Sequence, residues 1–168
     1  MDNSNISIDM KKFSLVKHDP RILELISETN HKILAIWAID FFNRGRYLFN
    51  KDYPENEIID KALDTLKLWI NDSITMWEAR KYCWVVLKSA REIEPKDKVA
   101  CQILRACSHT LATCHVPTHS EKASMYIISA IQHYYKNNEN VIELMEKERE
   151  WHISHLLELK KQRQILDK

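Results

Sequence analysis

The chain has 168 residues, 45% of them hydrophobic, with one glycine and four prolines. This length suits a single domain, and so few turn-forming residues argue against a sheet of many strands joined by tight hairpins. The 25 Lys and Arg residues nearly balance the 24 Asp and Glu residues, so no global field attracts nucleic acid or an anionic membrane. We therefore predict an all-α fold, a globular single-domain bundle of six or seven antiparallel helices, with no nucleic acid and no membrane among its partners.

Residues 1–17 are polar and are expected to form a flexible N-terminal segment. They contain no apolar stretch after a basic one, so we expect no signal peptide, and no apolar run approaches the roughly 18 residues that span a bilayer. The four cysteines form no CxxC pair and lie in segments with helical periodicity, which favours reduced, buried thiols. These features indicate a cytoplasmic protein.

Capping residues and apolar periodicity place the first helices. A short helix is expected after Asp19-Pro20, with the aspartate as its cap. A longer helix should follow a cap at Thr29 or Asn30 and run to about residue 49. Gly45 lies at the edge of the apolar stripe of this longer helix, where it either lets a neighbouring helix approach closely or marks a bend.

The middle of the chain has the clearest helical periodicity. One helix after residue 54 has apolar side chains at helical spacing: Ile59, Ala62, Leu63, Leu66, Trp69 and Ile70. Thr75 and Glu78 fit a capping box at the start of the next helix. We expect Pro95 to start a further helix that runs to about His115, and Pro117 to start the one after it.

The last part of the chain is highly charged. We expect the bundle domain to span residues 18–138, and residues 139–168 to form an amphipathic helix that packs on the bundle or projects toward a partner. His152 and His155, which lie among glutamates, are expected to be solvated. The segments 54–92 and 95–136 have similar lengths but share no residue-level repeat, so a globular bundle is preferred over a helical solenoid.

The stretch TLATCHVPTH, residues 110–119, places two histidines and a cysteine around one proline. Pro117 has no N–H donor and disfavours helical geometry at the preceding residue, so His115 should end one helix and His119 should lie in the first turn of the next. A zinc helix of the HExxH type needs both histidines on one unbroken helix beside a glutamate, and neither condition holds. We predict a hydrogen-bonded helix corner, with no metal and no cofactor.

Polar side chains on the central helices form the candidate functional cluster. Its arginines could pair with Glu78 and Asp40, either in a surface salt-bridge network or in a partly buried polar seam where the central helices face each other. Arg80 also shares a helix side with Trp77 and Trp84, so its guanidinium can stack on an indole ring. The cluster comprises Glu78, Arg80, Arg91, Arg105, His109, His115 and His119.

Three tryptophans are candidate interface residues: Trp77, Trp84 and Trp151. The first two lie off the main apolar stripe of their helix, so they suit either a second packed layer or an exposed anchor. The sequence shows no glycine-rich phosphate loop, no nucleophile elbow and no close carboxylate pair on an apolar helix face. No catalytic residue is therefore assigned.

Several segments, in this order, resemble a family of small helical proteins classed as immunity proteins of bacterial polymorphic toxin systems. They are TNHKILAIWAID (29–40), DYPEN (52–56), ALDTLKLWINDSITMWEAR (62–80), KSAR (88–91), ACQILRACSHTLATCHVPTH (100–119) and ASMYIISAI (123–131). The family pattern has a helix ending in W-A, a W before E-A-R, a later A-R, and A-T-A-H-V-x-x-H-A. It is matched by Trp37, Trp69, Glu78, Arg80, Arg91, Arg105, His115 and His119.

The resemblance spans about residues 19–135 and has departures. Glu57 and Ile58 stand where the family often has Arg-Pro, and Cys114 and Ser120 stand where alanines are usual. The charged helix after about residue 138 is expected to lie outside the region that resembles the family.

The resemblance implies a non-enzymatic binding protein whose partner is a cognate toxin protein, neutralised when its active surface is covered. An alternative is a metal-dependent or hydrolytic enzyme that uses His109, His115 and His119, with Glu78 or Arg80. A third possibility is a non-catalytic helical scaffold that forms a homo-oligomer through its last helix.

Overall fold

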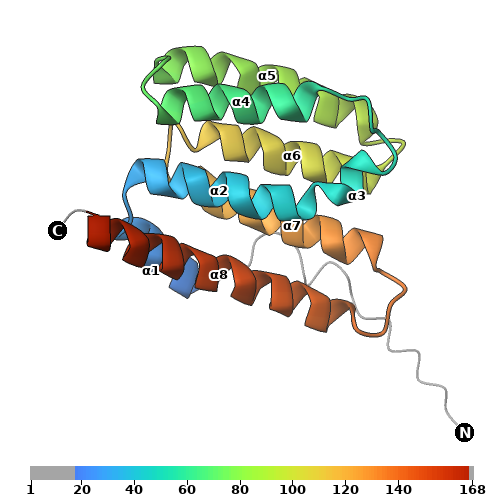
Figure 1. Cartoon of the computed structure of the whole chain (residues 1–168). Helices are drawn as coiled ribbons and strands as arrows, with labels where there is room; N and C mark the ends of the chain where they lie inside the picture. The colour runs from blue at the N-terminus through green and yellow to red at the C-terminus, as the bar shows by residue number, and fades with distance from the viewer. Residues whose placement is uncertain (1–17, 167–168) are drawn as a thin grey trace, which may run out of the picture.

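The computed structural model describes residues 18–166, which fold into eight helices and contain no strand (Figure 1). The helices are α1 (Pro20–Ser27), α2 (His31–Gly45), α3 (Tyr47–Asn50), α4 (Ile58–Ile70), α5 (Met76–Ile93), α6 (Lys98–Ala112), α7 (His119–Tyr134) and α8 (Val141–Leu166). The all-α prediction is confirmed, with one helix more than expected because the predicted second helix is divided into α2 and α3. The flexible segment expected at residues 1–17 lies outside the described residues.

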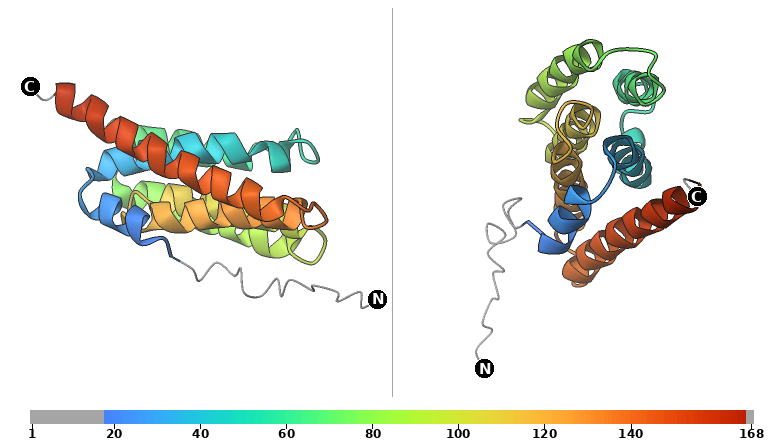
Figure 2. Two further views of the ribbon diagram at one scale, coloured as in Figure 1. Left: turned by 90° about the horizontal axis from the view of Figure 1, so that it is seen from below. Right: turned by 90° about the vertical axis from the view of Figure 1, so that its left-hand side faces the viewer.

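The helices form two layers that α8 closes at one edge. α5, α6 and α7 lie next to one another in one layer, and α4 and α2 pack over it (Figure 2). α8 crosses α2 and α7 at the edge opposite α5, with α1 beside it (Figure 1). The interior is filled by large side chains with less than 2% exposure, among them Trp37, Phe41, Phe42, Leu66, Ile103, Leu104 and Ile127.

Side-chain caps set four of the helix starts, those of α1, α2, α5 and α6. Asp19 caps α1, Asn30 caps α2, and the predicted capping box between Thr75 and Glu78 is present at α5. α6 begins later than expected, because Asp97 rather than Pro95 provides the cap: its carboxylate accepts from the Ala100 backbone N–H at 2.9 Å. A proline cannot supply that acceptor, so it lies in the preceding turn.

The predicted break between α6 and α7 is confirmed. α6 ends at Ala112, three residues before His115, and α7 begins at His119, so Pro117 lies in the turn between them. Backbone bonds from His115 N to the Ala112 carbonyl (2.9 Å) and from His119 N to the Val116 carbonyl (3.0 Å) shape this turn.

Gly45 fulfils both roles predicted for it. It is the last residue of α2 and is fully buried against α7. A Cβ atom at this position would lie 2.9 Å from both Cδ1 and Cγ2 of Ile127, closer than real Cβ contacts occur. Its lack of a side chain therefore lets α2 and α7 approach while the chain turns into α3.

The expectation that His152 and His155 are solvated is wrong. His152 is fully buried, and His155 is half-buried with its Nε2 atom 2.8 Å from Asp40 of α2. The side of α8 that carries them faces α2 and α7, where the Trp37 indole N–H donates to the His152 carbonyl at 2.8 Å. The last helix is thus packed on the bundle along a partly polar seam.

Candidate functional site

Two histidines of the candidate cluster meet where α6 and α7 join. The Nδ1 atoms of His109 and His119 lie 2.9 Å apart, and their ring centroids lie 5.0 Å apart. One Nδ1 must donate and the other accept, so the two neutral rings have opposite tautomers. Tyr126 of α7 stacks on His109 with its ring centroid at 5.3 Å, which covers the pair from one side.

Burial keeps this histidine pair neutral. Desolvation lowers the pKa of His109 to about 4, and the neighbouring His119 adds to the effect. The pKa of His119 is also lowered, first by burial and then by the positive charge of Lys122. At neutral pH the pair therefore has the hydrogen-bonding capacity of two imidazoles without a positive charge.

We expect this pair to make stability depend on pH. Because the folded pKa of His109 lies below the ordinary value of 6.5, the unfolded chain binds the proton first, and stability falls as pH drops from 6.5 toward 4. His109→Asn keeps an amide that can bond to His119 but does not titrate. Urea unfolding should show that wild type loses roughly 2 kcal/mol more than the variant between about pH 7.5 and about pH 4.5.

The same pH loss in the variant and in wild type would contradict this assignment. His152, whose pKa burial also lowers, is present in both proteins. It therefore cancels in the comparison.

Arg105 joins the histidine pair to α5. Its Nη2 atom donates at 2.9 Å to Glu94, the residue that follows α5. The neighbouring Tyr126 side chain is the main reason that the pKa of Arg105 is raised. Arg105, Tyr126, His109 and His119 therefore form one continuous polar strip along the α6–α7 contact.

Arg80 and His115 lie together at the N-terminal end of α5. The Arg80 guanidinium carbon is 5.7 Å from the centroid of the Trp77 ring, and the His115 ring centroid is 6.4 Å from that ring. Within the described residues the His115 Nδ1 atom is buried and has no hydrogen-bond partner. Arg80 stacks on Trp77, while Trp84 lies about one turn beyond Arg80 along α5.

The remaining predicted cluster members lie apart, and neither of the two carboxylates expected to pair with the cluster arginines does so. Glu78 accepts from the Thr75 backbone N–H at 2.7 Å and from its hydroxyl at 2.8 Å, so it caps α5 and pairs with no arginine. Asp40 pairs with His155 instead. Arg91 is exposed near the C-terminal end of α5, about four helical turns from Glu78.

The three candidate interface tryptophans lie in two separate parts of the structure, on α5 and on α8. Trp77 and Trp84 are 63% and 62% exposed on the outer side of α5. Trp151 is half-buried on α8, where it stacks on His155 with a centroid distance of 4.7 Å and lies 4.3 Å below the Arg44 guanidinium. Only the first two form a shared exposed surface.

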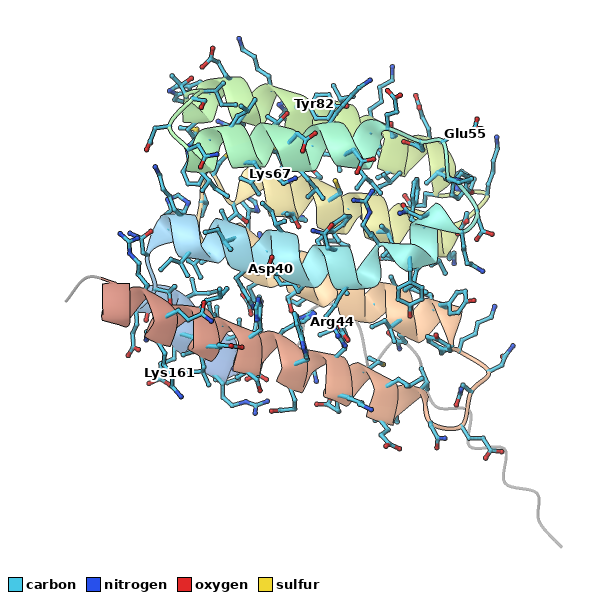
Figure 3. All side chains as sticks on the ribbon, viewed as in Figure 1. Asp40, Arg44, Glu55, Lys67, Tyr82 and Lys161 are labelled. Carbon is cyan, nitrogen blue, oxygen red and sulfur yellow. The ribbon has the colours of Figure 1, made fainter. Side chains whose placement is uncertain are left out.

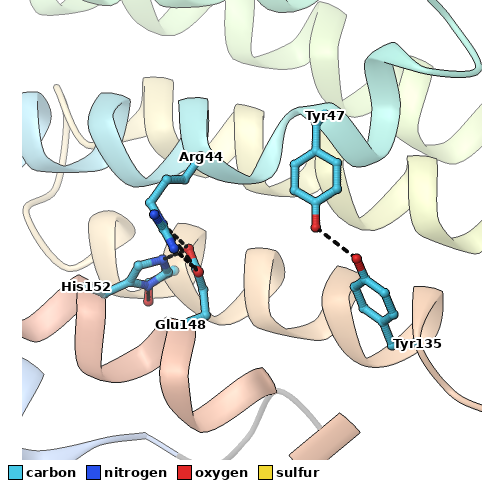
Figure 4. A network of polar contacts seen from close by, with 6 residues as sticks. Arg44, Tyr47, Tyr135, Glu148 and His152 are labelled. Atoms are coloured by element: carbon cyan, nitrogen blue, oxygen red, sulfur yellow. Dashed lines mark hydrogen bonds and ion pairs between the residues drawn. The ribbon is translucent and has the colours of Figure 1, made fainter. Parts of the chain in front are cut away.

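A buried polar network that sequence reasoning missed links α2, α7 and α8 (Figure 4). Ser124 Oγ is 2.7 Å from His152 Nδ1, and His152 Nε2 is 3.2 Å from Glu148 Oε1. Arg44 donates to both oxygens of Glu148, from Nε at 3.0 Å and from Nη2 at 3.0 Å. An ionised Glu148 can only accept hydrogen bonds, so His152 donates one to it from Nε2. The Nδ1 atom of His152 then accepts a hydrogen bond from the Ser124 hydroxyl.

This chain of serine, histidine and glutamate is structural. Ser124 is 1% exposed and His152 is 0% exposed, so no substrate can reach the hydroxyl. Burial alone would raise the pKa of Glu148, but hydrogen bonds from His152 and Arg44 outweigh it and lower the pKa to about 2. Burial lowers the pKa of His152, which we take to be neutral beside the ionised glutamate. The network holds α8 on the bundle.

Other chemical features of the described residues are modest. Among residues 18–166, no three His, Cys, Asp or Glu side chains are arranged to hold a metal ion. A cavity of about 310 Å³ lies between α1 and α8, and one of about 210 Å³ between α2 and α4; neither is lined by the histidine pair. No helix in this part of the chain is long and apolar enough to cross a membrane.

The fold and these clusters define a small all-helical protein with buried polar contacts and two exposed tryptophans on α5. Its sequence matches the family model described as "Imm-5 like putative immunity protein" over residues 24–159, so the chain belongs to this family. No curated protein and no solved structure matches the chain. The match extends through most of α8, so the expectation that the charged last helix lies outside the family region is wrong.

Proposed function

We propose that this protein binds a cognate bacterial toxin and neutralises it through protein–protein contact. Its family supports a role in immunity. The observation that carries the contact mechanism is the exposure of Trp77 and Trp84, both above 60%, on one side of α5. Tryptophan is enriched among the residues that dominate protein–protein binding energy, so an exposed pair on one helix suits a partner surface.

The geometry of α5 supports this use. Trp84 follows Trp77 by seven positions, so the two side chains lie about two turns apart on the same side of the helix. The capping box at Thr75 fixes the start of α5, and its inner side is buried through Ala79, Val86 and Ala90. Both indoles are therefore presented on a rigid element, which reduces the entropy lost on binding.

The enzymatic alternative has less support from the geometry. His109 and His119 use their Nδ1 atoms to bond to each other, and Tyr126 covers His109. A general base needs an accessible ring nitrogen within reach of a substrate proton. His115 has an unpaired Nδ1, but this atom is buried.

The scaffold alternative would need a free surface on α8. Four of its apolar residues, Val141, Met145, Ile153 and Leu156, are buried within the chain, where α8 packs on α2 and α7. The two large apolar side chains of α8 that are exposed, Ile142 and Leu157, are each about 40% exposed and lie about four helical turns apart, so they form no continuous apolar surface for a second copy.

We also propose that the protein acts in the cytoplasm, because its four cysteines are all free thiols, as expected in a reducing compartment.

Co-expression with a candidate toxin, taken from the genes that neighbour this one, tests the proposal. We expect growth of the poisoned host to be restored, and the two purified proteins to elute from gel filtration as one stable complex. Rescue without a complex would contradict the contact mechanism and favour the enzymatic alternative. If growth is not restored and no complex forms, the immunity role itself is contradicted.

A further inference from the structure

The outer side of α5 combines the exposed tryptophans with basic side chains. Six residues at helical spacing along it form what we call the α5 face: Trp77, Arg80, Lys81, Trp84, Lys88 and Arg91. α5 packs against α4 and α6 and forms the edge of the bundle opposite α8 (Figures 1 and 2). Five of these residues are exposed, and Arg80 is half-buried.

The cations of the α5 face are poorly compensated. Within residues 18–166, no carboxylate lies within ion-pair distance of Arg80, Lys81 or Arg91, and Lys88 reaches Glu92 only at 3.9 Å. Arginines on other elements have closer carboxylate partners: Arg21, Arg44, Arg46, Arg105 and Arg149. In a chain with a formal net charge of +1, this face is a local concentration of unpaired positive charge.

We propose that the α5 face is the toxin-binding surface and that it takes an acidic, carboxylate-bearing surface of the toxin. This inference rests on the proposed function and adds the chemistry of the partner. Trp77 and Trp84 would supply the buried apolar centre of the interface, and the flanking cations would steer the approach and pair with carboxylates. Arginine suits this pairing because its guanidinium binds a carboxylate with two parallel hydrogen bonds.

A protein partner fits this face better than a nucleic acid does. Glu78 lies beside Trp77, and Glu92 and Glu94 lie at the other end of α5. These carboxylates would repel a continuous run of phosphates, whereas a folded protein can place single acidic side chains opposite single cations.

Charge reversal on two exposed positions tests the inference. The probe is the toxin identified by the co-expression test, purified as a catalytically inactive variant, with association measured by biolayer interferometry. Lys81→Glu/Arg91→Glu should slow association roughly 10-fold at low ionic strength, and this difference should shrink as salt is added. The matched control is Lys147→Glu/Lys161→Glu on α8, which changes net charge equally on exposed positions and should leave association within about 2-fold of wild type.

Four results would overturn the inference. Equal slowing in both double variants would indicate a global charge effect, and unchanged association in the α5 variant would place the interface elsewhere; both leave toxin binding itself intact. A short single-stranded RNA that binds wild type but not the α5 variant would identify a nucleic acid as the occupant. Wild type that does not bind the toxin at all would remove the proposed function and this inference together.

Discussion

Replacing Glu148 with alanine is expected to destabilise the fold by about 3 kcal/mol. Glu148 accepts from His152, which is 0% exposed, so its removal leaves a buried N–H without an acceptor. That loss alone accounts for roughly 1–3 kcal/mol. The two bonds from Arg44 are lost as well, although its side chain is 45% exposed and can be solvated again.

Urea unfolding at neutral pH measures this effect, and Glu146→Ala is the matched control. Glu146 lies on the same helix and pairs with Arg149, but its side chain is 53% exposed, so its removal should change stability by less than about 1 kcal/mol. Similar values for the two variants would show that the Glu148 network contributes no more than a surface ion pair. Amide hydrogen exchange along α8 should be faster in Glu148→Ala, because this network fastens the helix.

Glu148 and His109 should respond to acid in different pH ranges. The pKa of Glu148 is lowered to about 2 from a model-compound value of 4.5, so its contribution is present above 4.5 and is lost as pH falls toward 2. The stability that depends on a neutral His109 is already lost as the pH falls from 6.5 to about 4. Because burial also lowers the pKa of His152, the α8 attachment loses stability below 6.5 as well, and it alone loses the further contribution of Glu148 as pH falls from 4.5 toward 2.

The helices could be predicted from sequence because their signals are local. Asp19, Asn30 and the Thr75–Glu78 pair lie within three residues of the backbone groups that they cap. The break at Pro117 is equally local. The helix ends were less accurate where two signals competed, as at α6, where Asp97 rather than Pro95 determines the start.

The polar partners could not be predicted, because they join distant parts of the chain. Asp40 and His155 are 115 positions apart, and Arg44 and Glu148 are 104 positions apart. One local signal was present: Glu148 and His152 continue the buried stripe of Val141, Met145 and Leu156 at spacings of three and four. Polar residues inside an apolar stripe indicate a buried network, even where glutamates surround them.

Truncation of the exposed tryptophans is expected to have the largest effect on function. Trp77→Ala and Trp84→Ala should each weaken binding of the cognate toxin by about 2 kcal/mol, or roughly 30-fold, mainly through faster dissociation. Their effect on folding should be small, because both side chains are more than 60% exposed. Trp77 also stacks with Arg80, an exposed cation–π contact that contributes only about 0.5–1 kcal/mol.

Trp151→Ala is the matched control, since it removes the same side chain from the opposite edge of the bundle. Trp151 stacks on His155 and lies under Arg44, so its loss should lower the free energy of unfolding and leave toxin affinity unchanged. Titration calorimetry and urea unfolding on all three variants separate the two effects. If Trp151→Ala loses affinity while the α5 variants retain it, the toxin binds beside α8, and the exposed tryptophans of α5 need another explanation.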